Sequence, residues 1–289
     1  MIVDTIPGPC QKMEHLRKYI KYLPFLYTFR NYFHRKTAEF YFISFPKSGR
    51  TWLRLMIGWY FVKHFKLERK FPLQLIYPIL LEPEMSYFYK EIPKIYMTHE
   101  ECYQRIKPED LNTCKSRYHN AKVLFLARNP RDVVISWYFH LKKYKQITTE
   151  NLDDFIKSDY GGLLTIITYY NIWAKNRNIP KQFYLLRYED LKENTHDELR
   201  SIMKFLGVNN VKEKIVNEAV RFGSFNNMRI LEENDTLKSF RLRPVDKNNQ
   251  DTYKTRRGMV NGFLDYVSSD DRRYIHQLVN NALSAMYNY

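Results

Sequence analysis

Residues Phe40 to Val62 read FYFISFPKSGRTWLRLMIGWYFV, and this stretch decides the fold. Its first part, Phe40–Phe45, is apolar and aromatic, with the length and composition of a buried strand. The next residues, Pro46–Gly49, end that strand and favour a tight turn. From Thr51 onward the residues favour helix and are apolar nearly all round, so we expect this helix to pack on several sides. The stretch therefore predicts a strand, a tight loop and a helix.

The loop of this unit has the features of an anion-binding site. Lys47 and Arg50 lie where the helix begins, and backbone N–H groups at a helix N-terminus favour an anion in front of them. The Walker A pattern of nucleotide triphosphatases requires Gly-Lys followed by Ser or Thr. None of the nine glycines is followed by Lys, which excludes that pattern. The loop is predicted to bind phosphate or sulfate, with a plain surface turn between two core elements as the alternative.

Composition and charge limit the class of protein. The 289 residues suffice for one large α/β domain or two small ones. The net charge of +16, from 47 Lys and Arg against 31 Asp and Glu, favours anionic partners such as nucleotides, nucleic acid or acidic membranes. Three cysteines without paired or metal-ligand spacing indicate reduced thiols and no metal site. Since there is no signal-peptide pattern and no apolar run of about 18 residues, we expect a cytoplasmic protein without a transmembrane segment.

Strand-like runs recur along the chain and alternate with helical stretches. They are Ile95–Thr98, Val123–Ala127 and Phe183–Leu186. Such alternation predicts an α/β fold, a three-layer α/β/α arrangement around a central, mostly parallel sheet. No linker or repeat divides the sequence, so we expect a single domain over residues 1–289 that begins with a helical, aromatic segment at 1–38.

A histidine follows the first of these runs. Ligands of parallel sheets bind at the carboxyl ends of the strands, and His99 comes directly after Ile95–Thr98. Because the unperturbed pKa of histidine is close to neutral, His99 is well placed for proton transfer. A histidine satisfied by structural hydrogen bonds is the alternative.

An arginine follows the second run. Arg128 comes directly after Val123–Ala127, and the Asn-Pro dipeptide behind it favours the start of a helix. Ser136 would lie about two turns into that helix. A guanidinium binds phosphate through paired N–H donors, and a hydroxyl adds one more bond. A structural ion pair between Arg128 and Asp132 is the alternative.

Two of these segments together resemble one family. Residues 46–52, PKSGRTW, are similar to the PKSGTTW loop of the sulfotransferases that use 3′-phosphoadenosine 5′-phosphosulfate (PAPS). Residues 126–138, LARNPRDVVISWY, resemble the 3′-phosphate motif of the same family. The motifs follow the family's order and separation, and the resemblance covers about Phe40 to Gly262.

The resemblance implies a PAPS-dependent sulfotransferase with a P-loop-like strand-loop-helix. It would move a sulfuryl group from PAPS to a hydroxyl or amine of a small organic acceptor by in-line transfer, releasing 3′,5′-adenosine bisphosphate (PAP). In the family the His of a Lys-Thr-His segment is the general base, which makes His99 the base here. Lys47 would stabilise the leaving oxygen. No metal is implied.

The resemblance also implies the cofactor contacts. Thr51 and the loop backbone would hold the 5′-phosphate, and Arg128, Ser136 and Arg257 would hold the 3′-phosphate that distinguishes PAPS from ATP. Aromatic members of the set would contact the adenine. The full set of implied cofactor-binding residues is Lys47, Ser48, Gly49, Arg50, Thr51, Trp52, Arg128, Ser136, Tyr188, Phe225, Arg256, Arg257 and Gly258.

The chain departs from the family's pattern in two places. Met97 stands where the family has the Lys of Lys-Thr-His, and Arg50 replaces a Thr of the loop. We hypothesise that Arg50 compensates for the cation lost at Met97. Residues 232–258 are rich in charged and amide side chains and are predicted to form a mobile loop over the cofactor. The family's tail pattern is incomplete after this loop, which leaves the oligomeric state open between monomer and homodimer.

The acceptor is the part that the sequence defines least. Residues 63–93 and 138–144 are rich in aromatic side chains and are predicted to shape its pocket. The loop looks like those of bacterial small-molecule sulfotransferases, so natural-product biosynthesis is expected, with a cyanobacterial acceptor of the saxitoxin type as a candidate. Two other classes stay open: a P-loop nucleotide kinase or phosphotransferase, and a basic nucleic-acid-binding protein. No nucleic-acid-binding module is recognisable, so no specific nucleic-acid partner is expected.

Overall fold

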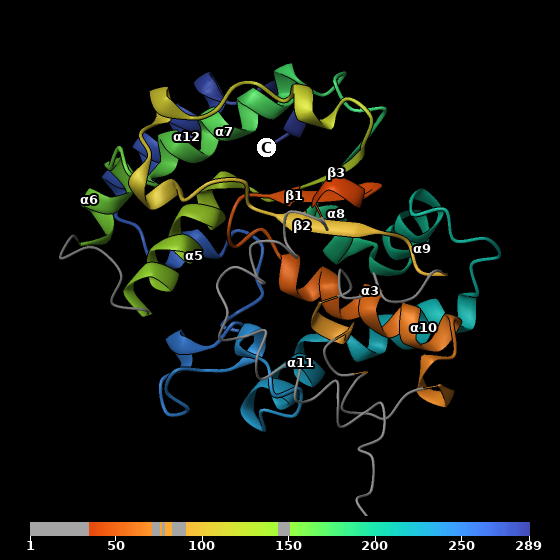
Figure 1. Ribbon diagram of the computed structural model, residues 1–289. Helices are drawn as coiled ribbons and strands as arrows, with labels where there is room; N and C mark the ends of the chain where they lie inside the picture. Colours follow the sequence, from red (N-terminus) through yellow and green to blue (C-terminus); the bar gives the residue numbers. More distant parts are fainter. Residues whose placement is uncertain (1–34, 71–75, 77–78, 83–90, 144–150) are drawn as a thin grey trace, which may run out of the picture. The chain divides into compact units, whose positions relative to one another are not determined.

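The computed structural model describes residues 35–70, 76, 79–82, 91–143 and 151–289. Its strands are β1 (Phe40–Ser44), β2 (Ile95–Thr98), β3 (Lys122–Ala127) and β4 (Gln182–Arg187). They form one parallel sheet in the order β2-β1-β3-β4 (Figure 1). The chain runs from β1 to its neighbour on one side, β2, and then crosses to β3 on the other side. A parallel sheet opens a ligand crevice at such a reversal, at the carboxyl ends of the strands.

Helices cover both faces of this sheet. The α-helices of the described residues are α3 (Arg50–His64), α5 (Pro130–Lys143), α6 (Leu152–Lys157), α7 (Leu163–Lys175), α8 (Tyr188–Glu193), α9 (Thr195–Phe205), α10 (Glu213–Phe222), α11 (Phe225–Glu233) and α12 (Ser269–Ala282). In Figure 1, α7 and α12 lie on one face, while α3 and α10 lie on the other. The predicted three-layer α/β/α fold is confirmed.

The strands agree with the apolar runs of the sequence to within one residue at each end. All five residues of β1 are buried, as a central strand covered on both faces requires. Apolar side chains of α3, among them Leu55, Ile57 and Phe61, pack into the main core together with Phe40 and Phe42 of β1. The helix that is apolar nearly all round is therefore packed on several sides, as predicted.

The last helix is shorter than the sequence indicated. The apolar spacing of Ile275, Val279 and Leu283 predicts a helix from roughly Asp270 to Tyr287, whereas α12 ends at Ala282. The Asn171 side chain explains this end: its Nδ2 donates to the Ala282 carbonyl oxygen at 2.7 Å, and its Oδ1 accepts from the Ser284 N–H at 2.8 Å. The Tyr287 hydroxyl donates to the carbonyl oxygen of Tyr170 at 2.6 Å. The chain after α12 is therefore fixed against α7.

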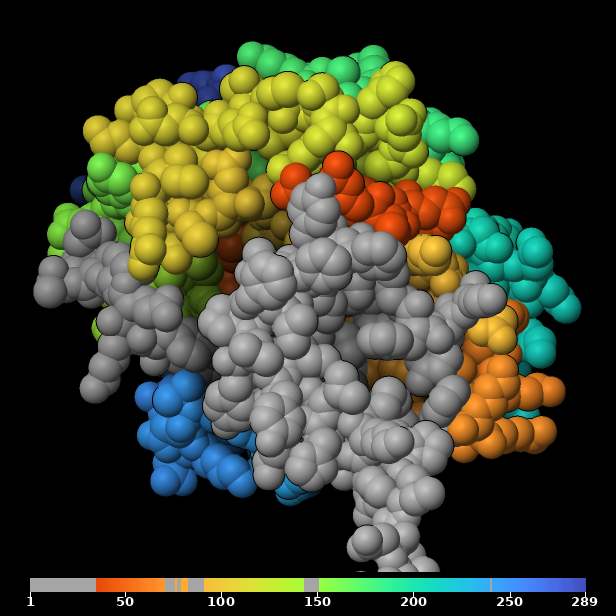
Figure 2. Space-filling model, viewed as in Figure 1, coloured from red at the N-terminus to blue at the C-terminus, as the bar shows by residue number. Residues whose placement is uncertain are grey.

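The segment 232–258 is more packed than its composition indicated. It contains 3₁₀ turns at Phe240–Leu242 and Gln250–Thr252, and the side chains of Leu242 and Tyr253 are buried. In Figure 1 the mid-blue part of the chain, which includes this segment, lies on the α11 side of the sheet, and in Figure 2 its atoms form the blue surface at the lower left. Its mobility stays a prediction.

By its internal contacts the chain divides into residues 1–38 and Glu39–Tyr289. Residues 1–34 lie outside the described part, so the helical segment expected at 1–38 and the single domain over 1–289 stay predictions. Parts of the predicted acceptor regions, 63–93 and 138–144, also lie outside it. Within the described ranges, no helix combines the length and the apolar character needed to cross a membrane.

Candidate active site

The loop between β1 and α3 has a backbone shape that restricts its residue types. Lys47 and Gly49 have positive φ angles of 71° and 101°. A Cβ atom at Gly49 would lie 2.6 Å from Cδ2 of Tyr188, so both the φ angle and the nearby ring require glycine. α3 begins directly afterwards at Arg50, and its first turn holds no acidic side chain. The N-terminus of α3 therefore favours an anion in front of it.

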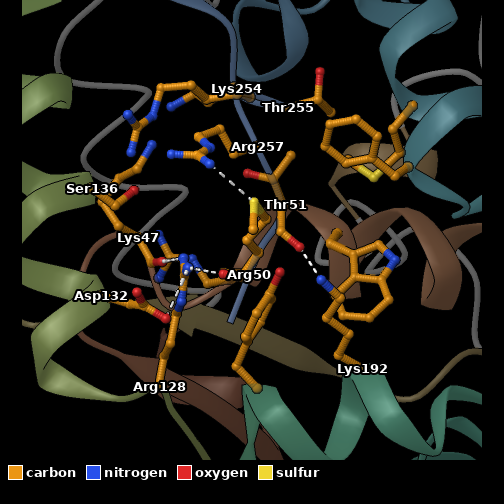
Figure 3. A pocket seen from close by; sticks show the side chains of 18 of the residues that line it. Lys47, Arg50, Thr51, Arg128, Asp132, Ser136, Lys192, Lys254, Thr255 and Arg257 are labelled. Atoms are coloured by element: carbon orange, nitrogen blue, oxygen red, sulfur yellow. Dashed lines mark hydrogen bonds and ion pairs between the residues drawn. The ribbon is translucent and has the colours of Figure 1, made fainter. Parts of the chain in front are cut away.

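A cavity of about 740 Å³ lies in front of this loop (Figure 3). Residues that follow each of the four described strands contribute to its lining, together with α3 and the segment 254–259. The lining brings together these predicted residues: Lys47, Gly49, Arg50, Thr51, Trp52, His99, Arg128, Ser136, Tyr188, Phe225, Arg256, Arg257 and Gly258. The Ser48 side chain is buried instead and donates to the Phe45 carbonyl oxygen at 3.0 Å. Whether these residues contact a cofactor stays a prediction.

Arg128 lies where the loop meets the segment around residue 259. Its guanidinium donates to the carbonyl oxygens of Lys47 at 3.3 Å and Met259 at 3.0 Å. The guanidinium carbon is 4.5 Å from the centre of the Tyr188 ring. Nη2 is also 3.7 Å from Oδ2 of Asp132, so the ion pair considered as the alternative is present as a long contact. These contacts hold a partly exposed cation at the cavity.

His99 is held in one tautomer by β1. Nδ1 is 2.8 Å from the carbonyl oxygen of Ser44, and because a carbonyl only accepts, Nδ1 carries the hydrogen. The lone pair then lies on Nε2, the atom that can take a proton. The pKa of His99 is well below its usual 6.5, first because of burial and then because of the charge on Arg50. The ring is therefore neutral at pH 7, the state that a general base needs.

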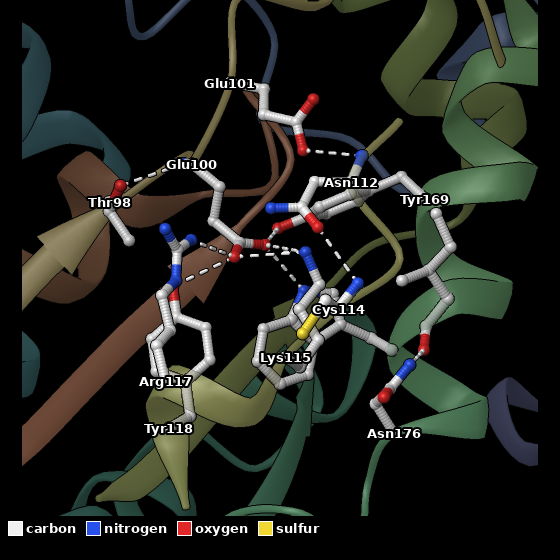
Figure 4. A network of polar contacts seen from close by, with 12 residues as sticks. Thr98, Glu100, Glu101, Asn112, Cys114, Lys115, Arg117, Tyr118, Tyr169 and Asn176 are labelled. Carbon is white, nitrogen blue, oxygen red and sulfur yellow. Dashed lines mark hydrogen bonds and ion pairs between the residues drawn. The ribbon is translucent and has the colours of Figure 1, made fainter. Parts of the chain in front are cut away.

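The residue after His99 is the centre of a buried polar network (Figure 4). Glu100 has a left-handed φ of 71°, and its side chain is fully buried. Its carboxylate accepts hydrogen bonds from Lys115 (3.2 Å), Arg117 (2.6 Å), Tyr118 (2.9 Å), Tyr169 (3.0 Å) and Trp173 (2.8 Å). Burial acts to raise the pKa of Glu100, but the charge on Lys115 and these hydrogen bonds outweigh it and lower the pKa. The charged carboxylate thus fixes the chain next to His99, a role that the sequence did not reveal.

A second buried carboxylate anchors the segment that ends at Gly258. Glu232 of α11 accepts the backbone N–H groups of Lys254 at 2.6 Å and Thr255 at 3.0 Å. A Cβ atom at Gly258 would lie 2.7 Å from the Phe225 ring, so these two predicted residues pack closely together. The segment is therefore fixed at the cavity by α11.

The two predicted arginines of this segment have different surroundings. The guanidinium carbon of Arg256 is 4.2 Å from the centre of the Phe139 ring, and Nη1 donates to the Tyr266 hydroxyl at 2.6 Å. Arg257 forms a partly exposed ion pair with Asp265 at 2.6 Å. Exposed ion pairs of this kind contribute little to stability and can yield to a ligand. Arg257 is therefore better placed than Arg256 to bind an anion.

Four cations of the lining were not predicted: Arg54, Lys192, Arg241 and Lys254. Arg54 is buried on α3, and its Nε lies 2.9 Å from Sδ of Met97. We had assigned the charge that compensates for Met97 to Arg50, and the structure provides Arg54 directly beside Met97. An arginine within an otherwise apolar helix was a usable signal for Arg54. No local pattern marked the two lysines.

Comparison with known proteins identifies the family. The family described as "Sulfotransferase domain" matches residues 38–287. Cytosolic sulfotransferase 12 of Arabidopsis thaliana is 26% identical over 219 residues, which cover 70% of this chain and 66% of that protein. Sulfotransferase 1B1 of Canis lupus familiaris is 26% identical over 239 residues, covering 75% and 77%. The solved structure of mouse sulfotransferase SULT7A1 complexed with PAP has the same fold, with a TM-score of 0.54 and 22% identity over 85% of this chain and 84% of that one.

The chain belongs to the PAPS-dependent sulfotransferase family. It is an enzyme of class EC 2.8.2, which transfers a sulfuryl group from PAPS to an acceptor and releases PAP. The nucleotide kinase and the nucleic-acid-binding protein that the sequence left open as alternatives are therefore set aside.

The residues of the cavity fit PAPS. Lys47 and the N-terminus of α3 offer donors to one anionic group, and Arg128 offers donors to another. Trp52 and Tyr188 meet edge to face, with ring centres 5.7 Å apart, and supply aromatic surface for a base. In the described part of the chain, no three His, Cys, Asp or Glu side chains gather as metal ligands would.

Proposed function

We propose that this enzyme transfers the sulfuryl group to a hydroxyl of a small organic acceptor, with His99 as the general base. The observation that carries the proposal is the Nδ1–H tautomer of His99 in a cavity shared with Lys47 and Arg128. This tautomer leaves Nε2 able to take a proton, and the two cations suit the anionic groups of PAPS. An amine acceptor is a second possibility within the same chemistry.

The donors around the cavity divide between the two phosphates of PAPS. Thr51 and the N–H groups at the start of α3 would hold the 5′-phosphate. Arg128, Ser136 and Arg257 would hold the 3′-phosphate. The adenine would lie among Trp52, Tyr188 and Phe225. This division is supported by the position of each residue in the cavity lining.

The chain's own residues would move one proton and stabilise one leaving oxygen. Bound PAPS supplies the sulfuryl group, and negative charge grows on the oxygen that it leaves and on the sulfuryl oxygens. Lys47 would stabilise the leaving oxygen. Nε2 of His99 would take the proton of the acceptor hydroxyl, so that its oxygen attacks with its full electron pair. Burial and the charge on Arg50, which lower the pKa of His99, keep Nε2 unprotonated before the reaction.

The remaining expectations belong to this proposal. The saxitoxin-type acceptor and a role in natural-product biosynthesis stay predictions from the sequence. We propose a cytoplasmic location, which is supported by the names of plant relatives called cytosolic sulfotransferases. Either a monomer or a homodimer is compatible with the proposal.

Release of PAP from PAPS, measured with a panel of hydroxyl-bearing acceptors, tests the role of His99. His99→Gln should lower kcat by about 100- to 10,000-fold, because a positioned base contributes that much. Its affinity for PAP, measured by calorimetry, should stay near the wild-type value. His119→Gln is the matched control, because His119 is exposed and lies outside the cavity lining. An unchanged kcat in His99→Gln would contradict the assignment.

A further inference from the structure

The stretch of chain that carries Arg257 lies between two anchors of its backbone. Before it, Glu232 accepts the Thr255 N–H at 3.0 Å, and after it, Asp132 accepts the Phe263 N–H at 3.0 Å. Between these anchors, residues 256–260 form no backbone–backbone hydrogen bond within the described part of the chain. Backbone groups without a helix or sheet partner bind side chains or water instead. The position of this stretch therefore depends on side chains from other parts of the protein.

Two cations hold the stretch by its carbonyl oxygens (Figure 3). Nζ of Lys192 donates to the carbonyl oxygen of Gly258, and Nη2 of Arg128 donates to that of Met259 at 3.0 Å. Arg128 follows β3, and Lys192 lies on α8, which follows the neighbouring strand β4. Hydrogen bonds from charged donors are stronger than those between neutral groups. The two cations therefore fix consecutive residues of the stretch at the carboxyl ends of adjacent strands.

Lys192 lies on the side of the cavity where we place the 3′-phosphate. It lines the cavity together with Arg128, Ser136 and Arg257, the residues proposed to hold that phosphate. Burial and the charge on Arg128 lower the pKa of Lys192, while the carboxylate of Asp132 acts in the opposite direction. Because charges act strongly only at short range, the ammonium group lies near both of these side chains. Lys192 thus belongs to the phosphate side of the cavity, although the sequence did not mark it.

The geometry at Gly258 connects Lys192 to Arg257. Gly258 has a positive φ of 61°, and a Cβ atom there would lie 2.7 Å from the Phe225 ring. The chain therefore turns closely against Phe225 at the residue directly after Arg257. With the Gly258 carbonyl held by Lys192, this turn fixes the direction in which the Arg257 side chain leaves the backbone. The guanidinium of Arg257 forms a partly exposed ion pair with Asp265, which can yield to a ligand.

We propose that Lys192 is a positioning residue, whose bond to the Gly258 carbonyl oxygen holds Arg257 where it meets the 3′-phosphate of PAPS. This inference rests on the proposed function, in which Arg257 binds that phosphate. It adds a residue that acts through the backbone of the stretch 256–260. Lys192 therefore governs how strongly the enzyme prefers a nucleotide with a 3′-phosphate over one without it.

The affinities for PAP and AMP test the inference, because AMP lacks the 3′-phosphate. Lys192→Met removes the ammonium group and keeps an unbranched side chain. It should raise the Kd of PAP, measured by calorimetry, by about five- to tenfold, because the charged hydrogen bonds of Arg257 are weakened. The Kd of AMP, measured by displacement of PAP, should change by less than about twofold. A merely structural role of Lys192 would weaken both nucleotides alike.

Two further variants serve as rescue and control. Lys192→Arg keeps a charged donor and should bind PAP within about threefold of the wild-type affinity. Lys204→Met is the matched control, because Lys204 is exposed on α9 and lies outside the cavity lining, and it should leave both affinities unchanged. The urea midpoint of each variant should equal that of the wild type, since exposed side chains contribute little to stability.

A double-mutant cycle tests whether Lys192 acts through Arg257. In the Arg257→Gln background, Lys192→Met should weaken PAP binding by less than about twofold, because the group that it positions is gone. A full five- to tenfold effect in that background would mean that Lys192 acts independently of Arg257, and the inference would fail.

The remaining outcomes separate this inference from the proposed function. If Lys192→Met leaves PAP affinity unchanged, or weakens PAP and AMP equally, the inference fails while the proposed function stands. If the wild type binds PAP no more tightly than AMP, or if Arg257→Gln alone has no effect on PAP, the failure lies in the proposed function, and the inference falls with it.

Discussion

Two clusters of charged side chains lie next to His99, and their surroundings differ. At Glu100, one buried carboxylate accepts hydrogen bonds from the side chains of five residues (Figure 4). In the cavity, Arg50, Arg54 and Lys254 place like charges around a space of about 740 Å³ (Figure 3). The charge of the first cluster holds buried side chains of the fold together, whereas the second cluster lines the cavity in which we propose that PAPS binds.

This difference separates charges that hold the fold from charges that line the proposed cofactor cavity. A charge can be buried at low cost only when partners and hydrogen bonds surround it, as they do at Glu100. His99 lies between the two clusters: Glu100 and the Tyr103 hydroxyl, which donates to the His99 carbonyl oxygen, fix its backbone, while its ring lines the cavity. The Glu100 cluster thus positions the proposed base, and the charges of the cavity cluster add to burial, the larger cause, in lowering its pKa.

The largest effect on stability is expected at the Glu100 cluster. Glu100→Gln leaves the ammonium group of Lys115, which is only 1% exposed, without its counter-charge. We expect the free energy of unfolding to fall by about 3–5 kcal/mol, measured by urea denaturation. Glu101→Gln is the matched control, because Glu101 accepts one hydrogen bond from the Asn112 N–H, and should change stability by less than about 0.5 kcal/mol. Equal losses in the two variants would remove the distinction between the clusters.

The next effect concerns the glycine of the anion-binding loop. The Cβ atom added by Gly49→Ala would require alanine to adopt a φ of 101° and would lie 2.6 Å from Cδ2 of Tyr188. The free energy of unfolding should therefore fall by about 1–3 kcal/mol. The variant should also lose about tenfold in affinity for PAP, the value of one hydrogen bond to a charged group. Gly207→Ala is the control, because φ is 72° there and nothing lies within 4 Å of the added Cβ. Calorimetry that finds the same loss of PAP affinity in both variants would contradict this role of the loop.

The pKa of His99 reports on the cavity cluster. In the ligand-free enzyme, an NMR titration should find this pKa well below 6.5, mainly because of burial, and Arg54→Gln should raise it, because one of the opposing charges is gone. His99→Gln identifies the signal among the eight histidines. Since the unfolded chain binds this proton more tightly, stability should fall as the pH drops below about 6.5. An unchanged His99 pKa in Arg54→Gln would mean that the charge on Arg54 does not contribute to lowering this pKa.

The smallest effect on stability is expected from a cation of the cavity. Lys254→Gln leaves the backbone N–H bond to Glu232 in place, since only the side chain changes. The free energy of unfolding should therefore stay within about 0.5 kcal/mol of the wild-type value in the same urea experiment. A loss of several kcal/mol would put Lys254 among the residues that hold the fold.

The strands and many of the cavity residues could be predicted because the pattern that marks them lies within a few neighbouring residues of the sequence. The apolar runs of β1 to β4 fixed the strands, and because parallel strands end at the same edge, the residues after them met in one cavity. The partners of Glu100 lie between 15 and 73 residues away along the chain, and no periodicity records such contacts. The same holds for Asn171, which ends α12 from another helix, and for the contact between Arg54 and Met97.

The central claim is that the cavity binds PAP through its 3′-phosphate, and calorimetric titration with PAP beside AMP and ADP tests it most directly. PAP should bind with a Kd of about 1 μM or tighter, and AMP and ADP much more weakly. Arg128→Ala should weaken PAP binding by about 10- to 100-fold, the value of a charged hydrogen bond, while Arg273→Ala, a surface control, should not. Equal, weak binding of the three nucleotides, or an unchanged affinity in Arg128→Ala, would contradict the account.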